Sequence, residues 1–376
     1  MLTEATRHRD FPSLAGLVYL NTAAEGIPPV QVGSALAQYF RDHQLGMDGR
    51  EQHAAQRRAV QELTAQLYGL SADEIGICSC SSEAYNLAAL ALKLKPGDEV
   101  IVNELDFPSG VTPWLQAGSP ATVKVWRFRQ GVLRVEDLVP LLGPKTRLVT
   151  VSLVSFYNGF LIPLPAVVEA VRRNSSALLA VDVTQALGRL PLELAGVDLI
   201  VSSTHKWILA CHGGGLVGVP RERAREWTVP AGGWYNLQDA FGPTRFDRAV
   251  SQPGAASFSV GMPNYPALYA IRAALEYIQG VGVEAIAAAS DPLVQSCLEG
   301  LAKLPVELIT PREPGTLAGI VAFRHPASEQ IHRRLRERNI HLMAHAGRLR
   351  VSLHGYNTLT DMDQFLAGLT EALKHV

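Results

Sequence analysis

The chain has 376 residues and a mass of 40.7 kDa, which is long enough for two domains or more. Hydrophobic residues make up 47% and charged residues 18%, a balance that excludes a disordered chain. The 34 Lys and Arg against 35 Asp and Glu give a net charge of -1, so no overall charge attracts nucleic acid.

From about residue 50 to 220, short apolar runs rich in β-branched residues alternate with helical patterns. The predicted strands are Glu74–Cys78, Glu99–Val102, Thr122–Phe128, Leu148–Val154, Leu178–Val183, Leu199–Ser202 and Leu216–Val219. The predicted helices are Glu51–Leu70, Glu83–Lys95 and Pro165–Arg173. This alternation favours a mainly parallel sheet covered on both faces, with ligands at the carboxyl ends of its strands.

After Trp234 the composition changes. Residues 234–262 are rich in Gly, Pro, Asn and Ser and are predicted to be a loop. A smaller α/β unit follows, with predicted helices Pro266–Ile278, Glu329–Arg338 and Thr360–Lys374 and predicted strands Val306–Ile309, Gly319–Arg324 and Arg348–Leu353. We expect a large domain over residues 20–260 and a small domain made of residues 1–19 and 261–376.

Neither secretion nor a membrane span is expected. The four cysteines cannot supply a disulfide framework, and the N-terminus MLTEATRHRDF has no apolar signal region. Residues 148–168 carry no formal charge, but Asn158-Gly159 and two prolines would break a spanning helix. The basic run at 333–338 has the apolar spacing of a solvated helix face. We predict a soluble cytoplasmic protein with neither a nucleic-acid nor a membrane partner.

Two residues at predicted strand ends suggest a specific chemistry. Lys206 is the only formally charged residue between Asp198 and Arg221, and such apolar company lowers a lysine pKa and favours the nucleophilic amine. Asp182 ends an apolar strand, with Gln185 three residues later. Pyridoxal phosphate needs this pair: a lysine for the Schiff base and an acid beside the pyridinium nitrogen. A snorkelling lysine and a capping aspartate remain the simpler alternatives.

A possible anion site precedes the second predicted helix. The segment Cys78-Ser79-Cys80-Ser81-Ser82-Glu83 places small hydroxyl residues at a helix start, where backbone N–H groups bind phosphate. Ser203 and His205, beside the lysine, could add donors from the other side. Simple N-capping by serine explains the same pattern without a ligand.

Six segments in order resemble class V aminotransferases, the fold-type I pyridoxal-phosphate enzymes that include cysteine desulfurases, selenocysteine lyases and isopenicillin N epimerase. The segments are YLNTAAEGIPP (19–29), SSEAYNLAAL (81–90), VDVTQALG (181–188), SSTHKW (202–207), GMPN (261–264) and RVSLHGYNT (350–358). The resemblance covers nearly the whole chain. It implies an α/β fold with a seven-stranded, mainly parallel sheet, a smaller C-terminal α/β domain, and a homodimer.

The resemblance also implies a role for each matching residue. Lys206 corresponds to the Schiff-base lysine, Asp182 to the partner of the pyridinium nitrogen, and Gln185 to the partner of the phenolic oxygen. Phosphate-binding positions correspond to Ser81, Ser82, Ser203 and His205. Arg350 corresponds to the arginine that holds the substrate carboxylate through two parallel hydrogen bonds. No metal is expected.

Four departures from the family narrow the expected reaction. Phe107 stands where the desulfurase branch has a ring-stacking histidine, and it can stack but cannot transfer protons. Residues 341–348 lack the mobile cysteine that stores persulfide. Met262 replaces a threonine that commonly reaches the partner subunit's cofactor phosphate. Phe156 replaces an asparagine near the ring hydroxyl, and Asn158 follows two positions later. We therefore predict chemistry without a persulfide.

The predicted function is that of an enzyme acting on an α-amino acid through an external aldimine, with Lys206 moving the Cα proton. Transamination and C–S lyase-type chemistry are both compatible with these residues, and epimerisation is the alternative. Residues of the Gly-rich loop could shape the substrate pocket, although packing roles explain them equally well. They are Trp234, Tyr235, Asn236, Arg245 and Arg248.

Three other interpretations are a nicotinamide oxidoreductase, a metal-binding protein and a non-catalytic binding protein. Gly213–Gly218 matches the dinucleotide fingerprint G-x-G-x-x-G of a nicotinamide oxidoreductase, but here the glycines precede a strand pattern instead of opening a helix. Cys78, Cys80, Cys211 and His212 lack zinc-site spacing, and the pair His341 and His345 is more typical of ordinary histidines. A non-catalytic binding protein would not be expected to keep both Lys206 and Asp182.

Overall fold

A seven-stranded sheet organises the first two thirds of the chain in the computed structural model, which describes residues 1–376. Its strands are β2 (Ile75–Cys78), β3 (Glu99–Asn103), β4 (Thr122–Trp126), β5 (Thr146–Ser152), β6 (Leu178–Asp182), β7 (Leu199–Ser203) and β8 (Gly215–Gly218). They lie in the order β2-β8-β7-β6-β5-β3-β4, and β8 alone is antiparallel to its neighbours. The predicted mainly parallel sheet is confirmed, and each predicted strand is present within two residues of its expected ends.

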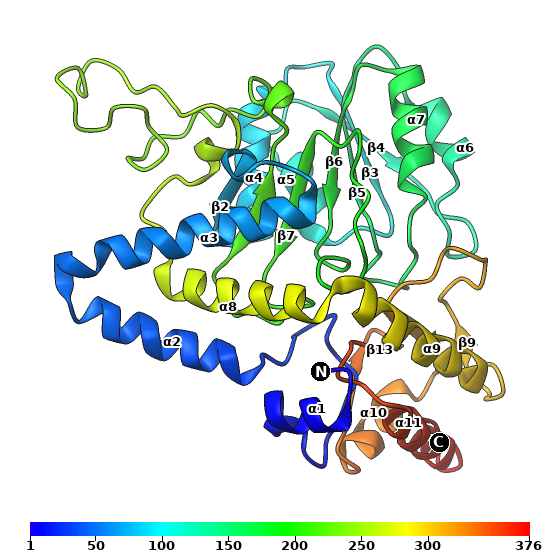
Figure 1. The fold of residues 1–376 in the computed structure, drawn as a ribbon. Coiled ribbons are helices and arrows are strands. Elements are labelled where there is room, and N and C mark those ends of the chain that lie inside the picture. Colours follow the sequence, from blue (N-terminus) through cyan, green and yellow to red (C-terminus); the bar gives the residue numbers. More distant parts are fainter.

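Helices cover both faces of this sheet (Figure 1). Successive residues of a strand point to opposite faces, so β6 contributes Leu179 and Val181 to one core cluster and Leu178 and Ala180 to another. The first cluster includes side chains of α3 (Arg50–Tyr68), α7 (Leu164–Asn174) and α8 (Tyr265–Val281). The second includes side chains of α4 (Ser81–Leu92) and α5 (Pro108–Leu115). The central strands are therefore buried on both sides.

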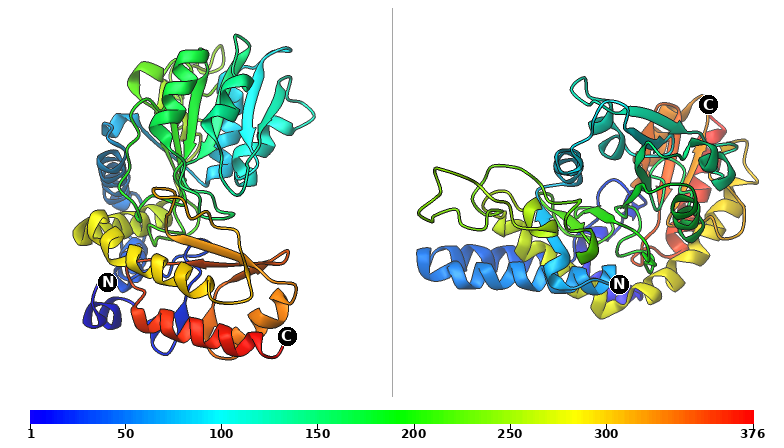
Figure 2. Two further views of the ribbon diagram at one scale, coloured as in Figure 1. Left: turned by 90° about the vertical axis from the view of Figure 1, so that its right-hand side faces the viewer. Right: turned by 90° about the horizontal axis from the view of Figure 1, so that it is seen from above.

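A four-stranded antiparallel sheet lies below the large sheet in the left view of Figure 2. Its order is β12 (Met343–His345), β13 (Arg348–Ser352), β10 (Ile320–Arg324) and β9 (Glu307–Leu308). Its core includes side chains of α9 (Val283–Leu301), α10 (Ser328–Arg336) and α11 (Leu359–Leu373). The N-terminal β1 (Val18–Tyr19) pairs with β11 (Ile340–His341), so a segment near the N-terminus packs with this C-terminal region. The basic run 333–338, which covers the end of α10 and the two residues after it, is exposed at each of its arginines, as predicted.

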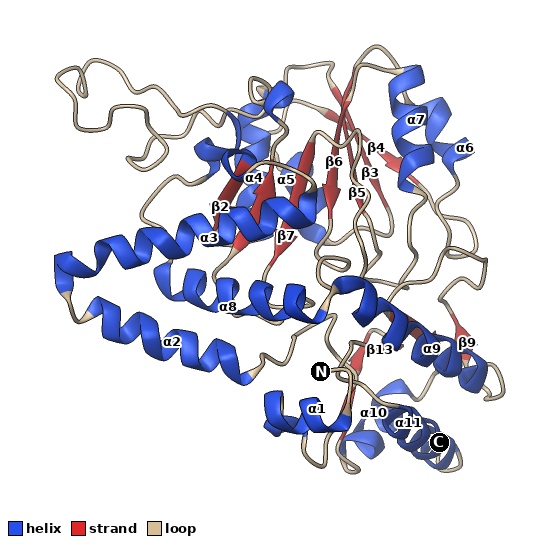
Figure 3. Ribbon diagram, in the orientation of Figure 1, coloured by secondary structure: helices blue, strands red, loops and turns tan.

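Several helices were not predicted from the sequence. They are α1 (Glu4–Asp10), α2 (Val30–His43), α5, α6 (Val135–Leu138) and α9. The uncharged segment 148–168 is divided among β5, a loop and α7, as expected, and none of the helices has the length and apolar character needed to cross a membrane. Residues 234–253 contain neither helix nor strand, as predicted for the loop 234–262, and the short 3-10 helix Gly254–Phe258 interrupts the rest of it (Figure 3).

Candidate active site

Lys206 lies just after β7, at the carboxyl end of the parallel strands, where ligands bind in such sheets. Its Nζ atom is 5.1 Å from the centre of the Phe107 ring. Burial lowers the pKa of Lys206, Arg350 lowers it further, and the charges of Asp182 and Glu25 oppose this shift. The direction agrees with the sequence prediction, and it favours the neutral amine that a nucleophile needs.

The backbone around Lys206 is fixed by close contact with Gly26. The Gly26 N–H donates to the carbonyl of His205 at 2.8 Å. A Cβ atom on Gly26 would lie 2.0 Å from the carbonyl oxygen of Lys206, so only glycine fits at this position. The segment after β1 thus holds the lysine turn in place.

We expect Gly26→Ala to destabilise the protein by about 1–3 kcal/mol, because the added methyl group must push the Lys206 backbone away. Gly33→Ala is the matched control, since Gly33 is exposed on α2 with no atom within 4 Å of the added Cβ. That change should be neutral or stabilise the helix by about 0.5–1 kcal/mol. Denaturant unfolding measures both variants. Equal stabilities would contradict the close packing at Gly26.

Asp182 is the last residue of β6 and is 7% exposed. Its Oδ1 atom accepts a hydrogen bond from the Thr184 backbone N–H at 2.7 Å, so the expected capping contact exists. Burial raises the pKa of Asp182, while the Thr184 hydrogen bonds and the charge of Lys206 oppose the rise. A carboxylate can accept several hydrogen bonds, so Asp182 retains acceptor capacity for a ring N–H.

A cluster of hydroxyl groups joins the start of α4 to the end of β7. The Ser203 hydroxyl bonds to the Ser81 hydroxyl at 2.9 Å, and both residues are buried. The residue before α4, Cys80, makes no side-chain capping bond. The first N–H groups of the helix have no partner within the helix, so they remain available to an anion. The alternative that a serine simply caps this helix is therefore wrong. Unlike Ser81 and Ser203, Ser82 is exposed.

His205 lies beside this cluster and stacks on His212 at a ring-centre distance of 4.4 Å. Burial lowers the pKa of His205 to about 4, and the charges of Lys206 and His212 add to the effect. The imidazole is therefore neutral at pH 7 and can donate one hydrogen bond. The cysteines considered as metal ligands with His212 do not gather around it. The side chains whose ligand atoms lie near that of His212 are those of His205 and Glu25.

Gln185 is held by two neighbours that fix its amide. Its Nε2 atom donates to the carbonyl of Ala23 at 3.1 Å, and the Trp207 indole N–H donates to its Oε1 atom at 2.6 Å. The second N–H of Nε2 is left for a ligand oxygen. This orientation suits the predicted contact with a phenolic oxygen.

Arg350 lies on β13 in the small sheet and is 3% exposed. Its Nη1 atom donates to the carbonyl of Phe156 at 2.8 Å, while its Nε atom is buried without a partner. Burial lowers the pKa of Arg350 to about 10, so the group is still charged at pH 7. A buried, charged guanidinium with an unpaired N–H is suited to a carboxylate.

Five of the predicted site residues meet at one cavity of about 800 Å³ between the two sheets. Phe107, Gln185, His205, Lys206 and Arg350 all line it, whereas Asp182 and the serines lie beyond its wall. Sequence reasoning missed several other lining residues: Tyr157, Arg324, Met343, His345 and Arg348. Arg348 could have been found from the period of two along β13, whereas Arg324 could not, because its place depends on strand pairing.

The residues of the Gly-rich loop do not line this cavity within one chain, which corrects the expectation from their sequence position. The guanidinium of Arg57 lies over the Tyr235 ring, and that of Arg245 lies over the Phe246 ring. Asn236 is buried, and its side-chain amide donates a hydrogen bond to the carbonyl of Ala231. Met262 lines a separate space of about 220 Å³ with Ser79, Glu83 and Gly213. The side-chain amide of Asn158 also does not face the cavity, because it donates a hydrogen bond to the carbonyl of Gly131.

The dinucleotide reading of Gly213–Gly218 is wrong. These glycines lead into and through β8, an antiparallel strand, and only the three-residue 3-10 helix Arg221–Arg223 follows it, so they do not open an α-helix. A Cβ on Gly215 would lie 2.7 Å from the Cys80 backbone, so this glycine permits close packing beside the start of α4.

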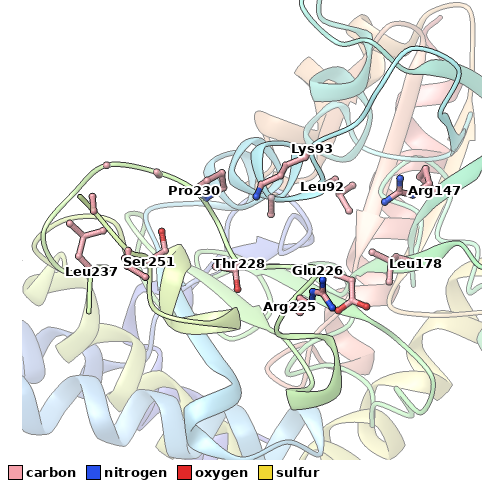
Figure 4. A pocket seen from close by; sticks show the side chains of 15 residues that line it. Leu92, Lys93, Arg147, Leu178, Arg225, Glu226, Thr228, Pro230, Leu237 and Ser251 are labelled. Carbon is pink, nitrogen blue, oxygen red and sulfur yellow. The ribbon is translucent and has the colours of Figure 1, made fainter. Parts of the chain in front are cut away.

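A second cavity, of about 720 Å³, lies under the long loop (Figure 4). Its wall includes Lys93, Arg147, Arg225 and Leu178. Leu178 begins β6 and Asp182 ends it, so this space lies at the opposite end of the strands from Lys206. It is not part of the candidate active site.

Together, the residues at the carboxyl ends of β6 and β7 fit pyridoxal phosphate. The amine of Lys206 suits its aldehyde, the buried carboxylate of Asp182 suits its ring nitrogen, and the uncapped start of α4 suits its phosphate. Phe107 lines the same cavity, where its ring lies edge to face with that of Phe156. This position is compatible with the predicted stacking of Phe107 on the cofactor ring.

Comparison with known proteins identifies relatives along nearly the whole chain. An uncharacterized aminotransferase, YcbU, from Bacillus subtilis is 27% identical over 94% of this chain and 93% of its own length. A cysteine desulfurase from Pectobacterium atrosepticum is 28% identical over 96% and 95%. A probable cysteine desulfurase from Mycolicibacterium paratuberculosis is 29% identical, but this chain covers only 56% of its length.

Solved structures share the fold. The apo cysteine desulfurase of Thermococcus onnurineus matches with a TM-score of 0.90 and 22% identity over 100% of this chain and 99% of its own. The cystine C-S lyase C-DES, in complex with its product cysteine persulfide, matches with a TM-score of 0.86 and 23% identity over 96% and 99%. The sequence model described as Aminotransferase class-V matches residues 18–365. The chain therefore belongs to the class V aminotransferases and is an enzyme of the fold-type I, pyridoxal-phosphate-dependent group.

Proposed function

We propose that this enzyme acts on an α-amino acid by transamination or by C–S lyase-type cleavage that stores no persulfide on the protein. The observation that carries the proposal is one cavity reached by the Lys206 amine and by the Arg350 guanidinium, which has no carboxylate partner. In this proposal residues 20–260 bind the cofactor, and the small domain (residues 1–19 and 261–376) contributes Arg350.

Each residue has a role that its surroundings support. When bound, pyridoxal phosphate supplies an electron sink for negative charge at the substrate Cα. Asp182 holds the proton on the ring nitrogen, and Gln185 donates to the phenolic oxygen. Ser81, Ser82, Ser203 and His205 bind the phosphate. Arg350 holds the substrate carboxylate, and the freed Lys206 amine takes and returns the Cα proton.

Cysteine positions support chemistry without a persulfide. The cavity wall contains no cysteine. Cys78 and Cys297 are buried, and burial raises the pKa values of both thiols, so neither is a reactive thiolate. Cys80 is exposed next to α4, outside the cavity wall. The desulfurases among the relatives favour cleavage of a C–S bond. However, no cysteine that could store a persulfide is among the residues that line the cavity.

Products distinguish the possible reactions. Holoenzyme is incubated with amino acids, with and without a keto acid, in deuterated buffer. Keto-acid-dependent amine transfer would support an aminotransferase, and pyruvate with sulfide from cysteine would support a lyase. Deuterium uptake at Cα with racemisation alone would replace the proposal with epimerisation. Protein-bound persulfide during turnover would contradict the absence of a storing cysteine.

We further propose that the enzyme is a homodimer. Large apolar side chains are exposed at the α2–α3 end, including Phe40 at 63% and Met47 at 73%, and in the long loop, including Phe241 at 77% and Phe246 at 87%. The loop and the α2–α3 end extend toward the same side of the molecule (Figures 1 and 2), and Arg57 of α3 lies 5.1 Å from the Tyr235 ring centre. A second copy would cover this apolar surface.

We expect light scattering to give twice the chain mass of 40.7 kDa. The double variant Phe40→Glu/Met47→Glu should shift the mass to that of one chain, because charges oppose burial of this surface. Leu359→Glu is the control, since Leu359 is 63% exposed at the start of α11, away from the α2–α3 end. A monomeric wild type would contradict the proposed homodimer.

A further inference from the structure

We propose that the cavity contains a second anion-binding position, formed by Arg348, and that the substrate is an amino acid with a second negative group on its side chain. The inference rests on the proposed function, in which Arg350 takes the α-carboxylate. It adds the substrate class, which the family match leaves open.

Arg348 and Arg350 are neighbours on one face of β13. They are two residues apart, so their Cα atoms are about 6.6 Å apart along the strand and their side chains share a face. Both side chains line the cavity. The strand register places Arg324 of β10 and His345 of β12 on either side of Arg348. Three arginines thus gather at the small-domain wall.

The charge of this wall is not balanced within the protein. Arg348 and Arg350 are only 4% and 3% exposed, yet neither makes an ion pair. Of the three arginines, only Arg324 has a carboxylate partner, Glu307 at 3.7 Å. No Asp or Glu is among the residues that line the cavity. A buried cation without a counter-ion is costly, so each of the two buried guanidinium groups calls for an anionic ligand group. An α-carboxylate satisfies only one of them.

Arg348 is held in place in a way that leaves donors unused. Its Nη1 atom donates to the carbonyl of Tyr157 at 2.6 Å, and its guanidinium carbon lies 4.4 Å from the Tyr157 ring centre. Its Nη2 atom has only the Met343 sulfur, at 3.9 Å. A guanidinium has five N–H donors, so most of those of Arg348 remain for a ligand. A fixed, stacked guanidinium is well suited to bind a carboxylate or a phosphate.

The class of substrate follows from this arrangement. Side chains that end in a carboxylate, a sulfinate or a phosphate would pair with Arg348, whereas their neutral counterparts would leave it unpaired. A hydrogen bond to a charged group typically changes binding by roughly 10- to 100-fold. We therefore expect kcat/KM to favour anionic over matched neutral amino acids by about this factor.

The test compares matched substrates on the holoenzyme: aspartate with asparagine, glutamate with glutamine, and O-phosphoserine with serine, with cysteine sulfinate as a further anionic substrate. Arg348→Gln should lose the preference by lowering kcat/KM for the anionic amino acids alone. Arg350→Gln should lower kcat/KM for both members of each pair. Arg333→Gln is the control, because Arg333 is an exposed arginine on α10 outside the cavity wall, and it should keep the preference. The substrate that gains most from Arg348 identifies the anionic group.

Binding of unreactive acids gives a readout that does not depend on turnover. By calorimetry, wild type should bind succinate or glutarate roughly 10- to 100-fold more tightly than butyrate, and Arg348→Gln should bind them alike. If no amino acid reacts but this difference persists, the proposed function fails and the anion position stands.

Two results would overturn the inference. The first is a wild type that treats acidic and neutral amino acids alike. The second is an equal loss for both classes in Arg348→Gln, which would make Arg348 a support for Tyr157 only. Arg348→Lys keeps the charge without the stacking and guards against misfolding of the glutamine variant. It should keep part of the preference, and its complete loss there would also contradict the inference.

Discussion

Replacing Lys206 by alanine is expected to abolish turnover while leaving the fold intact. The amine is the only lysine on the cavity wall, and burial already prepares it for proton transfer by lowering its pKa. Proton transfer by a positioned side chain contributes roughly 10²- to 10⁴-fold, so we expect the rate to fall at least about 10³-fold. The cofactor should still bind through its phosphate, but without a covalent link. Steady-state kinetics and the absorption of the bound cofactor measure the two effects.

Lys303→Ala is the control for this variant, because Lys303 is exposed and lies outside the cavity. It should leave both the rate and the cofactor spectrum unchanged. A Lys206→Ala enzyme that kept more than about a tenth of wild-type turnover would contradict the assigned role.

Asp182→Asn is expected to lower kcat strongly without unfolding the protein. Asparagine keeps an oxygen that can accept from the Thr184 N–H, now bonded at 2.7 Å, but it has no charge to hold a proton on the ring nitrogen. Removing one preorganised electrostatic contact typically costs roughly 10²- to 10³-fold, which is the loss in kcat that we expect. If Asp182 were only a cap, the asparagine variant would keep its activity.

Asp198→Asn is the matched control, because Asp198 is also a buried aspartate, 2% exposed, but lies next to the opposite end of the sheet. Its carboxylate pairs with Arg172 at 2.6 Å and Arg223 at 2.8 Å. Because these arginines are 32% and 34% exposed, losing the charge-assisted hydrogen bonds should cost about 1–3 kcal/mol, so stability should fall while kcat stays. Unfolding curves and kcat for both variants separate the two kinds of aspartate.

The central fold was predictable because its strands are short, β-branched and separated by turn residues. The helices that sequence reasoning missed lack such signals. α2 follows Pro29, has no side-chain cap, and exposes the apolar side chains of Leu36 and Phe40. α9 contains Pro292 and is separated from α8 by Gly282 alone. Helix boundaries of this kind depend on packing, which a local pattern does not contain.

The chemistry of the site was predictable from residue types, but its substrate wall was not. Asp182 ends β6 and Lys206 follows β7, and these strands adjoin in the sheet, so their proximity could be inferred from the α/β pattern. Arg350 reaches them from another sheet, and only the family resemblance suggested its role. Tyr157, whose carbonyl accepts a hydrogen bond from Arg348, comes from a segment that reaches β13 only when the two sheets pack. Arg324 comes from β10, and its place beside Arg348 depends on strand pairing within the small sheet.

The most direct test of the account is the reaction of the purified enzyme, supplied with pyridoxal phosphate, with borohydride. We predict a yellow absorption band that borohydride bleaches, and peptide mapping that places the reduced cofactor on Lys206. A folded protein that forms no such band, or a label on another lysine, would contradict the central claim that Lys206 is the cofactor-bearing residue of this enzyme.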